Sequence, residues 1–189
     1  MTSQARFKAR KTKQQHREWL IESVRTHVLP EITRRGFDAA PVVSRGPVDR
    51  EYLLSLPFGR LFRIRQSRVE LAEIQFASSR RAAFRINVGV PPKEGIETFT
   101  GHWAPEELDA GGLPDHFEMY AHPRWWTWFS VWHWPGLSLS KADYDKLAVR
   151  VGGFVPELEL ALSEGQLGPH MRRVVIPHPA IKPPCKSGS

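Results

Sequence analysis

The sequence predicts an α+β fold, an antiparallel sheet of about four strands packed on an N-terminal and a C-terminal helix. Apolar residues recur at every second position through three consecutive segments between residues 61 and 90, as half-buried strands require. Apolar stripes at helical spacing precede and follow this region. No composition break divides the 189 residues, so we expect one domain over 15–168, between a basic disordered tail, 1–14, and a proline-rich basic tail, 169–189.

The first expected element is a helix that begins at Gln15. Its apolar stripe packs on the sheet and comprises Leu20, Val24, Val28 and Ile32. Pro30 lies within the stripe and should kink or restart the helix, because proline removes a backbone donor. Gly36 after two arginines predicts the C-terminal cap, with Phe37 folding back onto the helix. A proline- and glycine-containing connection over 38–59 follows, with one helical turn expected over 49–55.

The three strands of the meander occupy residues 61–90, and the apolar pattern predicts their register. Connections of odd length, Ser67 to Val69 and Ser79 to Arg81, keep the apolar residues, Ile64 among them, on one face that is core. The predicted apolar pairs are Phe62 opposite Ile74 and Ile74 opposite Ile86. The predicted polar pairs are Arg63 opposite Glu73, Glu73 opposite Asn87, and Gln75 opposite Arg85.

The second face of this predicted sheet is a polar lattice with two interpretations. Its members are Arg63, Arg65, Glu73, Gln75, Arg85 and Asn87. The first interpretation is a solvated surface of cross-strand pairs, each worth up to about 1 kcal/mol. The second is a binding surface of paired donors and acceptors.

An acidic connection over 93–123 leads to a tryptophan-rich segment, Arg124 to Trp134, which predicts the fourth strand. A short helix should begin at Pro105, with Glu106 and Glu107 in its first turn. In the strand, Phe129 and Val131 should face the core, while the even-numbered tryptophans share the side of the polar lattice. These tryptophans are either buried core or an aromatic platform for a ligand or partner, and the candidate binding residues are Trp126, Trp128 and Trp132.

The last expected helix begins after Ser140, which caps a first turn that contains Asp143. Gly152, Gly153 and Pro156 should bend or break it near the middle. After Gly168 the chain should be a tail, although Val174 to Ile176 would suit a short edge strand.

The net charge of +7 is a property of the tails. Residues 1–17 contain six basic residues and residues 169–189 contain four, with no acid in either, so the body between them has a net charge of −3. Within the body, seven arginines lie between Arg60 and Arg85, and seven acids lie between Glu94 and Glu118. We expect these two segments to face each other or to bind oppositely charged partners.

The sequence contains no motif typical of a secreted, membrane-spanning, catalytic or metal-binding protein. One cysteine, Cys185, leaves no internal disulfide, and the N-terminus has no apolar signal region, so we expect a cytoplasmic protein without a membrane span. No phosphate loop or nucleophile motif is present, so no catalytic residue and no cofactor are predicted. The histidine spacings match no familiar metal motif, so no metal site is predicted either.

A set of short motifs resembles the bacterial domain of unknown function 4304 family. The resemblance covers residues 18–165 and rests on Gly36-Phe37, the strand end Ile74-Gln75-Phe76, the segment from Phe84 to Val90, and Arg124 to Trp126. It implies an α+β domain with an antiparallel sheet and carries no chemistry to transfer.

The function predicted from these patterns is a non-catalytic binding domain that recognises a protein partner. The alternative is a nucleic-acid-associated protein that uses its basic tails and a tryptophan and arginine sheet face. An enzyme is the third interpretation, because Arg63, Glu73, Arg85 and Asn87 together would suit an anionic substrate. These interpretations differ in one testable respect: whether the even-numbered tryptophans are buried under the last helix or exposed to solvent.

Overall fold

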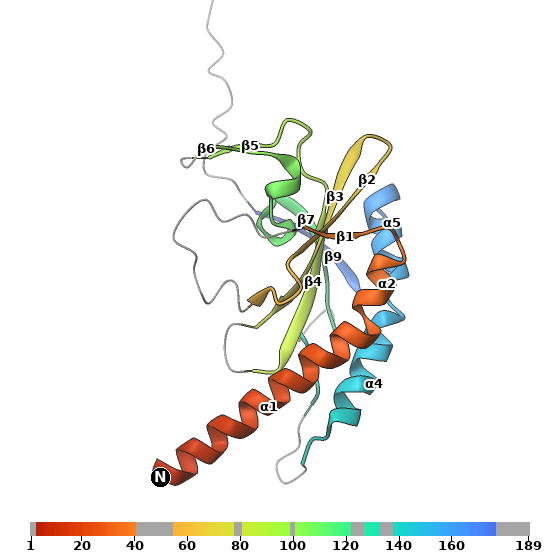
Figure 1. Ribbon diagram of the computed structural model, residues 1–189. Coiled ribbons are helices and arrows are strands. Elements are labelled where there is room, and N and C mark those ends of the chain that lie inside the picture. Colours follow the sequence, from red (N-terminus) through yellow and green to blue (C-terminus); the bar gives the residue numbers. More distant parts are fainter. Residues whose placement is uncertain are drawn as a thin grey trace, which may run out of the picture.

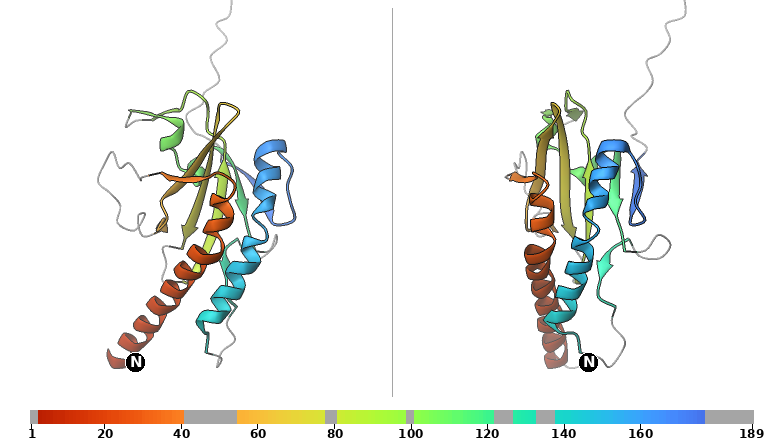
Figure 2. Two further views of the ribbon diagram at one scale, coloured as in Figure 1. Left: turned by 45° about the vertical axis from the view of Figure 1, so that its right-hand side comes forward. Right: turned by 90° about the vertical axis from the view of Figure 1, so that its right-hand side faces the viewer.

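The computed structural model describes residues 3–40, 55–77, 81–98, 101–121, 127–132 and 138–176. One antiparallel sheet has helices along one of its faces (Figures 1 and 2). The predicted α+β class with an antiparallel sheet is confirmed, but the sheet has seven strands instead of about four. The helical turn predicted over 49–55 lies almost entirely outside the described residues.

The helical layer contains two pairs of helices. The first pair is α1 (Ser3–His27) and α2 (Leu29–Thr33), which restarts around Pro30 as predicted, and Gly36 follows it with a φ of 83°. The second pair is α4 (Lys141–Gly152) and α5 (Pro156–Glu164), and the break between them falls at the predicted glycines and proline. Ser140 and Asp143 form the predicted N-terminal cap of α4.

The main sheet has the strand order β1-β2-β3-β4-β7-β9, and β8 also pairs with β4. Its strands are β1 (Asp38–Ala40), β2 (Arg60–Arg65), β3 (Arg68–Phe76), β4 (Ala83–Gly89), β7 (Asp115–Met119), β8 (Phe129–Ser130) and β9 (Met171–Val175). A separate hairpin contains β5 (Ile96–Thr98) and β6 (Gly101–Trp103). Two short turns follow it, η1 (Pro105–Glu107), at the predicted place, and η2 (Ala110–Gly112).

The predicted register of β3 with β4 is confirmed. Ile74 pairs with Ile86, Glu73 with Asn87, and Gln75 with Arg85. The two isoleucines are buried in the main core.

The predicted register of β2 with β3 is wrong. Phe62 pairs with Leu71 instead of Ile74, and Arg63 pairs with Glu70 instead of Glu73. The connection is a two-residue turn, Gln66 and Ser67, with φ angles of 50° and 60°. Such a turn twists in the same sense as the strands, but it normally carries asparagine or glycine. A loop of even length turns every side chain of β2 to the other face of the sheet.

The sheet therefore has two unlike faces. The helix face packs on the helices, and its buried residues include Leu61, Ala72, Ile74, Phe76, Phe84, Ile86 and Val88. The second face contains Glu73, Gln75, Arg85 and Asn87, and η2 packs on part of it against a small apolar cluster around Leu71 and Leu113. Ile64, predicted to be core, is 71% exposed near the tip of the β2–β3 hairpin.

Both predicted domain limits require correction. Residues 3–14, predicted to be disordered, are the start of helix α1. At the other end, β9 extends the sheet beyond Gly168 by pairing with β7, so the short edge strand considered for Val174 to Ile176 forms around Met171–Val175.

The tryptophan-rich strand forms only in part. Among the described residues of 124–134, only Phe129 and Ser130 are in a strand, and they pair with Phe84 and Ala83. Phe129 is buried in the core and Val131 packs against that core, as predicted. Since β7 and β8 both pair with β4, they occupy one position in the sheet, interrupted by residues 120–128.

Candidate binding site on the second face of the sheet

Five of the nine candidate residues lie together in the structure. Glu73, Gln75, Arg85 and Asn87 lie together on the second face, as predicted, and Trp128 lies beside them. Trp132 lies two residues beyond β8. Trp126 lies outside the described residues. The other two candidates, Arg63 and Arg65, are not part of this group.

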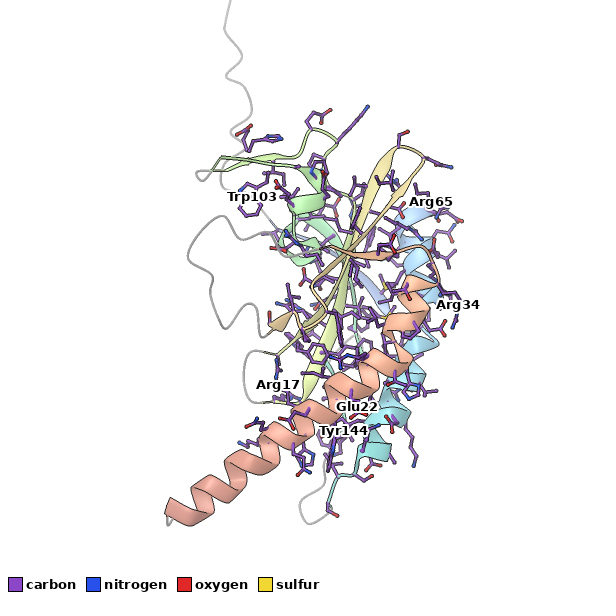
Figure 3. The ribbon with its side chains drawn as sticks, viewed as in Figure 1. Arg17, Glu22, Arg34, Arg65, Trp103 and Tyr144 are labelled. Carbon is purple, nitrogen blue, oxygen red and sulfur yellow. The ribbon has the colours of Figure 1, made fainter. Side chains whose placement is uncertain are left out.

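Arg63 and Arg65 lie on the helix face, which corrects the predicted lattice. Arg63 is buried and its guanidinium contacts two carboxylates, with Nε 2.6 Å from Glu70 Oε2 and Nη1 2.5 Å from Glu159 Oε1. Arg65 lies beside α5 (Figure 3) and bonds Glu159 at 2.9 Å. Burial acts to lower the pKa of Arg63, but its bonds to Glu159 and Glu70 outweigh burial and raise that pKa. The proposed enzyme cluster of Arg63 with Glu73, Arg85 and Asn87 therefore does not form.

Glu73 is a buried carboxyl group that has neutral hydrogen-bond donors. Asn87 Nδ2 donates to its Oε1 at 3.1 Å, and the backbone N–H of Gly111 in η2 donates to Oε2 at 3.3 Å. Burial raises the pKa of Glu73, the charge of Asp109 raises it further, and the two donors and Arg85 only partly oppose this effect. Glu73 is therefore the group on this face that most favours its protonated form.

Asn87 is fully buried between Glu73 and the η2 turn. A Cβ atom at Gly111 would lie 2.5 Å from Asn87 Nδ2, so only glycine lets the turn approach this closely. Asn87 Oδ1 has no hydrogen-bond partner among the described residues, which leaves an acceptor for a bound water molecule or a donor from a ligand.

Arg85 is at the centre of a chain of polar contacts across β3, β4, β7 and β9. Its Nε donates to Gln75 Oε1 at 2.7 Å and its Nη1 to Glu118 Oε1 at 2.8 Å. Arg172 on β9 donates from Nε to the second oxygen of Glu118 at 2.8 Å. Glu118 is buried, whereas both guanidinium groups are partly exposed. One buried carboxylate thus fixes two arginines that remain accessible.

Trp128 adjoins this chain of contacts. The Arg85 guanidinium carbon lies 4.8 Å from the ring centroid of Trp128, in cation–π geometry, and Trp128 is half-buried. Trp132, two residues beyond β8, is 62% exposed, whereas Val131 packs against the helix-side core. These two tryptophans are therefore not buried under the last helix.

Sequence reasoning missed Glu118, Arg172 and Gly111 as members of this site. The predicted attraction between the arginine-rich and acidic segments is present as the Arg85–Glu118 ion pair and as Arg60, which is 3.8 Å from Asp109. That charge contrast was the signal for Glu118. No pattern pointed to Arg172 or Gly111, because β9 was assigned to a tail and η2 to a connection.

The arrangement suits recognition more than bond chemistry. It offers two oriented arginines, an aromatic ring and a buried acceptor, which are groups that bind and position a partner. Within the described residues, no three His, Cys, Asp or Glu side chains gather as metal ligands. Among the helices that the structure describes, none is long and apolar enough to cross a membrane.

Comparison with known proteins gives no match: no family model, no curated protein and no solved structure matches the chain. The resemblance to the domain of unknown function 4304 family therefore stays a prediction.

Proposed function

We propose that this chain is a non-catalytic interaction domain that recognises a protein partner through a surface on the second face of the sheet. This surface, the Trp/Arg surface, comprises Arg85, Trp128, Trp132 and Arg172. The observation that carries the proposal is Trp128, whose ring packs on Arg85, an arginine that a buried glutamate fixes, with the mostly exposed Trp132 further along the same segment. Tryptophan and arginine are the residue types most enriched among the dominant contacts of protein interfaces.

The rigidity of the arginines supports a protein partner. A long side chain that is already held in place loses less conformational freedom on binding, so more of the contact energy appears as affinity. Arg85 is held by Gln75, Glu118 and Trp128, and Arg172 is held by Glu118. The two guanidinium groups share one carboxylate and leave a modest positive excess, which suits a partner with an acidic residue beside an apolar one.

Nucleic acid is the second candidate, because Trp128 stacked on Arg85 also resembles a platform for a base. The charge distribution argues against it. Residues 18–168 have a net charge of −3, and Glu118 offsets one of the two arginines on this surface, so only one positive charge is left there. A polyanion would gain little from this surface, and its attraction would come from the basic residues at the two ends of the chain.

Site-specific photocrosslinking tests the proposal. An aromatic photocrosslinking amino acid at position 132 should give discrete protein adducts in a native lysate. The same residue at position 149 is the matched control, because Val149 is also exposed but lies on α4. Arg85→Ala in the position-132 protein should remove the adducts, since it removes a contact without touching the crosslinker. Equal adducts from both positions would contradict the proposal.

A titration with labelled single-stranded oligonucleotides separates the second candidate. We expect weak binding that falls steeply with salt and is unchanged by Trp132→Ala. Affinity that resists salt and falls by about tenfold or more in Trp128→Ala or Trp132→Ala, the range for a stacked base, would favour nucleic acid instead.

A further inference from the structure

Strand β9 is an edge of the main sheet. It pairs with β7 from Met171 to Val175, and no other strand in the described part of the chain pairs with its outer side. An edge strand presents backbone donors and acceptors that another strand can use. Natural edges are usually protected by lysine, proline, a bulge or a covering segment.

The hydrogen bonds at both ends of β9 show which residues have outward backbone groups. The N–H of Tyr120 donates to His170 O at 2.9 Å, and the N–H of Ile176 donates to Pro114 O at 2.7 Å. In an antiparallel ladder the bonded residues alternate, so even-numbered residues of β9 bond towards β7. The N–H and C=O groups of Arg173 and Val175 therefore point away from the sheet.

Exposed apolar side chains concentrate around this edge. Seven large apolar residues are exposed in the described part of the chain, and four of them lie in the segment that runs from α5 through β9: Leu160, Leu167, Val175 and Ile176. Val175 alone is 67% exposed. Helix α5 lies beside β9 (Figure 2), so the segment that contains these residues runs along one side of the sheet. Such a concentration of apolar surface is typical of an interface.

The positive charges of the two arginines on β9 are neutralised by acidic residues of the same chain. Arg172 pairs with Glu118, and Arg173 pairs with Asp115, with Nε 2.8 Å from Oδ1. Each positive charge is thus matched within the same chain. The edge is electrically close to neutral and apolar at its C-terminal end, which suits a second copy of itself better than an acidic peptide.

We propose that β9 pairs with β9 of a second copy of this chain, in antiparallel orientation, and joins the two sheets into one. The register places Val174 opposite Val174 of the partner subunit, on the two-fold axis. Arg173 then lies opposite Val175 of the partner subunit, and these two residues exchange the outward hydrogen bonds. The pairing is isologous, as a two-fold interface requires.

The neighbouring registers are less favourable. An axis at Arg173 places two arginines directly opposite each other, which is destabilising. An axis at Val175 places Arg173 opposite a residue beyond the end of β9, so the two strands overlap less. A two-fold axis perpendicular to the sheet also keeps both α5 helices on the same face of the joined sheet.

A disulfide across the axis tests the register directly. Directly opposite residues in a non-hydrogen-bonded pair have Cα atoms about 4.5 Å apart. A disulfide spans about 4.4 to 6.8 Å, so Val174→Cys, in a Cys185→Ser background, should form an intermolecular bond under mild oxidation. Val175→Cys is the control, because its diagonal neighbour is about 7 to 8 Å away. We expect at least tenfold more crosslinked dimer from position 174. Equal crosslinking at both positions, or none, would overturn the register.

Sedimentation of the full chain between about 1 and 200 μM tests the dimer itself. Val175→Pro removes the outward N–H of residue 175, which makes no bond to β7, so the fold should survive. It should raise the dimer dissociation constant at least tenfold, whereas Val175→Thr, which keeps the N–H, should raise it less than threefold. A wild-type chain that stays monomeric throughout would overturn the proposal. Trp132→Ala should leave the dimer intact, so the dimer proposal and the proposed role of the Trp/Arg surface are tested independently.

Discussion

Glu70 and Glu73 are two buried carboxylates on one strand, three residues apart, and they lie on opposite faces of the sheet. Glu70 is 0% exposed on the helix face and contacts Arg63 and Arg68. Glu73 is 3% exposed on the second face, where its two hydrogen-bond donors are neutral and Asp109 opposes its charge. Burial is nearly the same, but one site supplies cations and the other favours the proton. Burial raises the pKa of Glu73 because its donors and the charge of Arg85 offset burial only in part, whereas Glu70 contacts two guanidinium groups at the same depth.

The strongest test of this contrast removes the cation on the helix face. Arg63→Met keeps an unbranched apolar stem but leaves Glu70 with Arg68 alone and Glu159 with Arg65. Leaving a buried charge without its partner costs about 3 to 5 kcal/mol of unfolding free energy. Urea unfolding at neutral pH measures this loss. The double variant Arg63→Met with Glu70→Gln should recover part of it, and a single variant within 1 kcal/mol of wild type, well below that scale, would contradict the role assigned to the pair.

On the second face, we expect a substitution of Glu73 to raise the unfolding free energy, by less than the Arg63 substitution lowers it. The pKa of Glu73 is raised in the folded chain, so its contribution to stability is largest below the pKa of the unfolded chain and is lost as pH rises through the folded pKa. Glu73→Gln cannot ionise, so its unfolding free energy relative to wild type should rise between pH 4 and pH 8. Thermal and urea unfolding across this pH range measure the difference.

Glu70→Gln is the control for that experiment. It removes the acceptor that Arg63 and Arg68 share, so at neutral pH it should destabilise the fold. If both glutamine variants shift stability in the same direction, the contrast between the two faces is wrong.

The smallest expected effect tests the register that separates the faces. Ile64 is mostly exposed near the hairpin tip, so Ile64→Ala should change the unfolding free energy by less than about 0.5 kcal/mol. The register predicted from the sequence placed Ile64 in the core, where the same change costs about 2 to 5 kcal/mol. Ile74→Ala, a buried neighbour on β3, provides the core reference in the same experiment.

The contrast between the two hairpins also explains what the sequence could predict. The β3–β4 register was predictable because Ile74, Phe76, Phe84 and Ile86 leave one choice that buries them together. In β2, apolar and arginine residues alternate, and either phase places plausible residues on either face. The turn that decides it, Gln66-Ser67, lacks the asparagine or glycine that usually marks a two-residue hairpin loop.

The candidate site, like the sheet register, was predicted only in part. Glu73, Gln75, Arg85 and Asn87 were placed together because they depend only on the β3–β4 pairing. Arg63 and Arg65 were misplaced because a buried arginine with two carboxylates gives the same sequence pattern as a solvated one. Arg172 was missed because β9 pairs with a strand more than fifty residues earlier, and no local periodicity reveals such a partner.

The two helix pairs break at the same level. Position 152, at the end of α4, faces the last residue of α1 so closely that a Cβ there would lie 2.7 Å from the His27 carbonyl oxygen. A proline follows within the next few residues in both chains of helix, at Pro30 and at Pro156. The breaks in the two helix pairs therefore lie side by side in the helical layer. Any side chain larger than hydrogen at position 152 would push the ends of α1 and α4 apart.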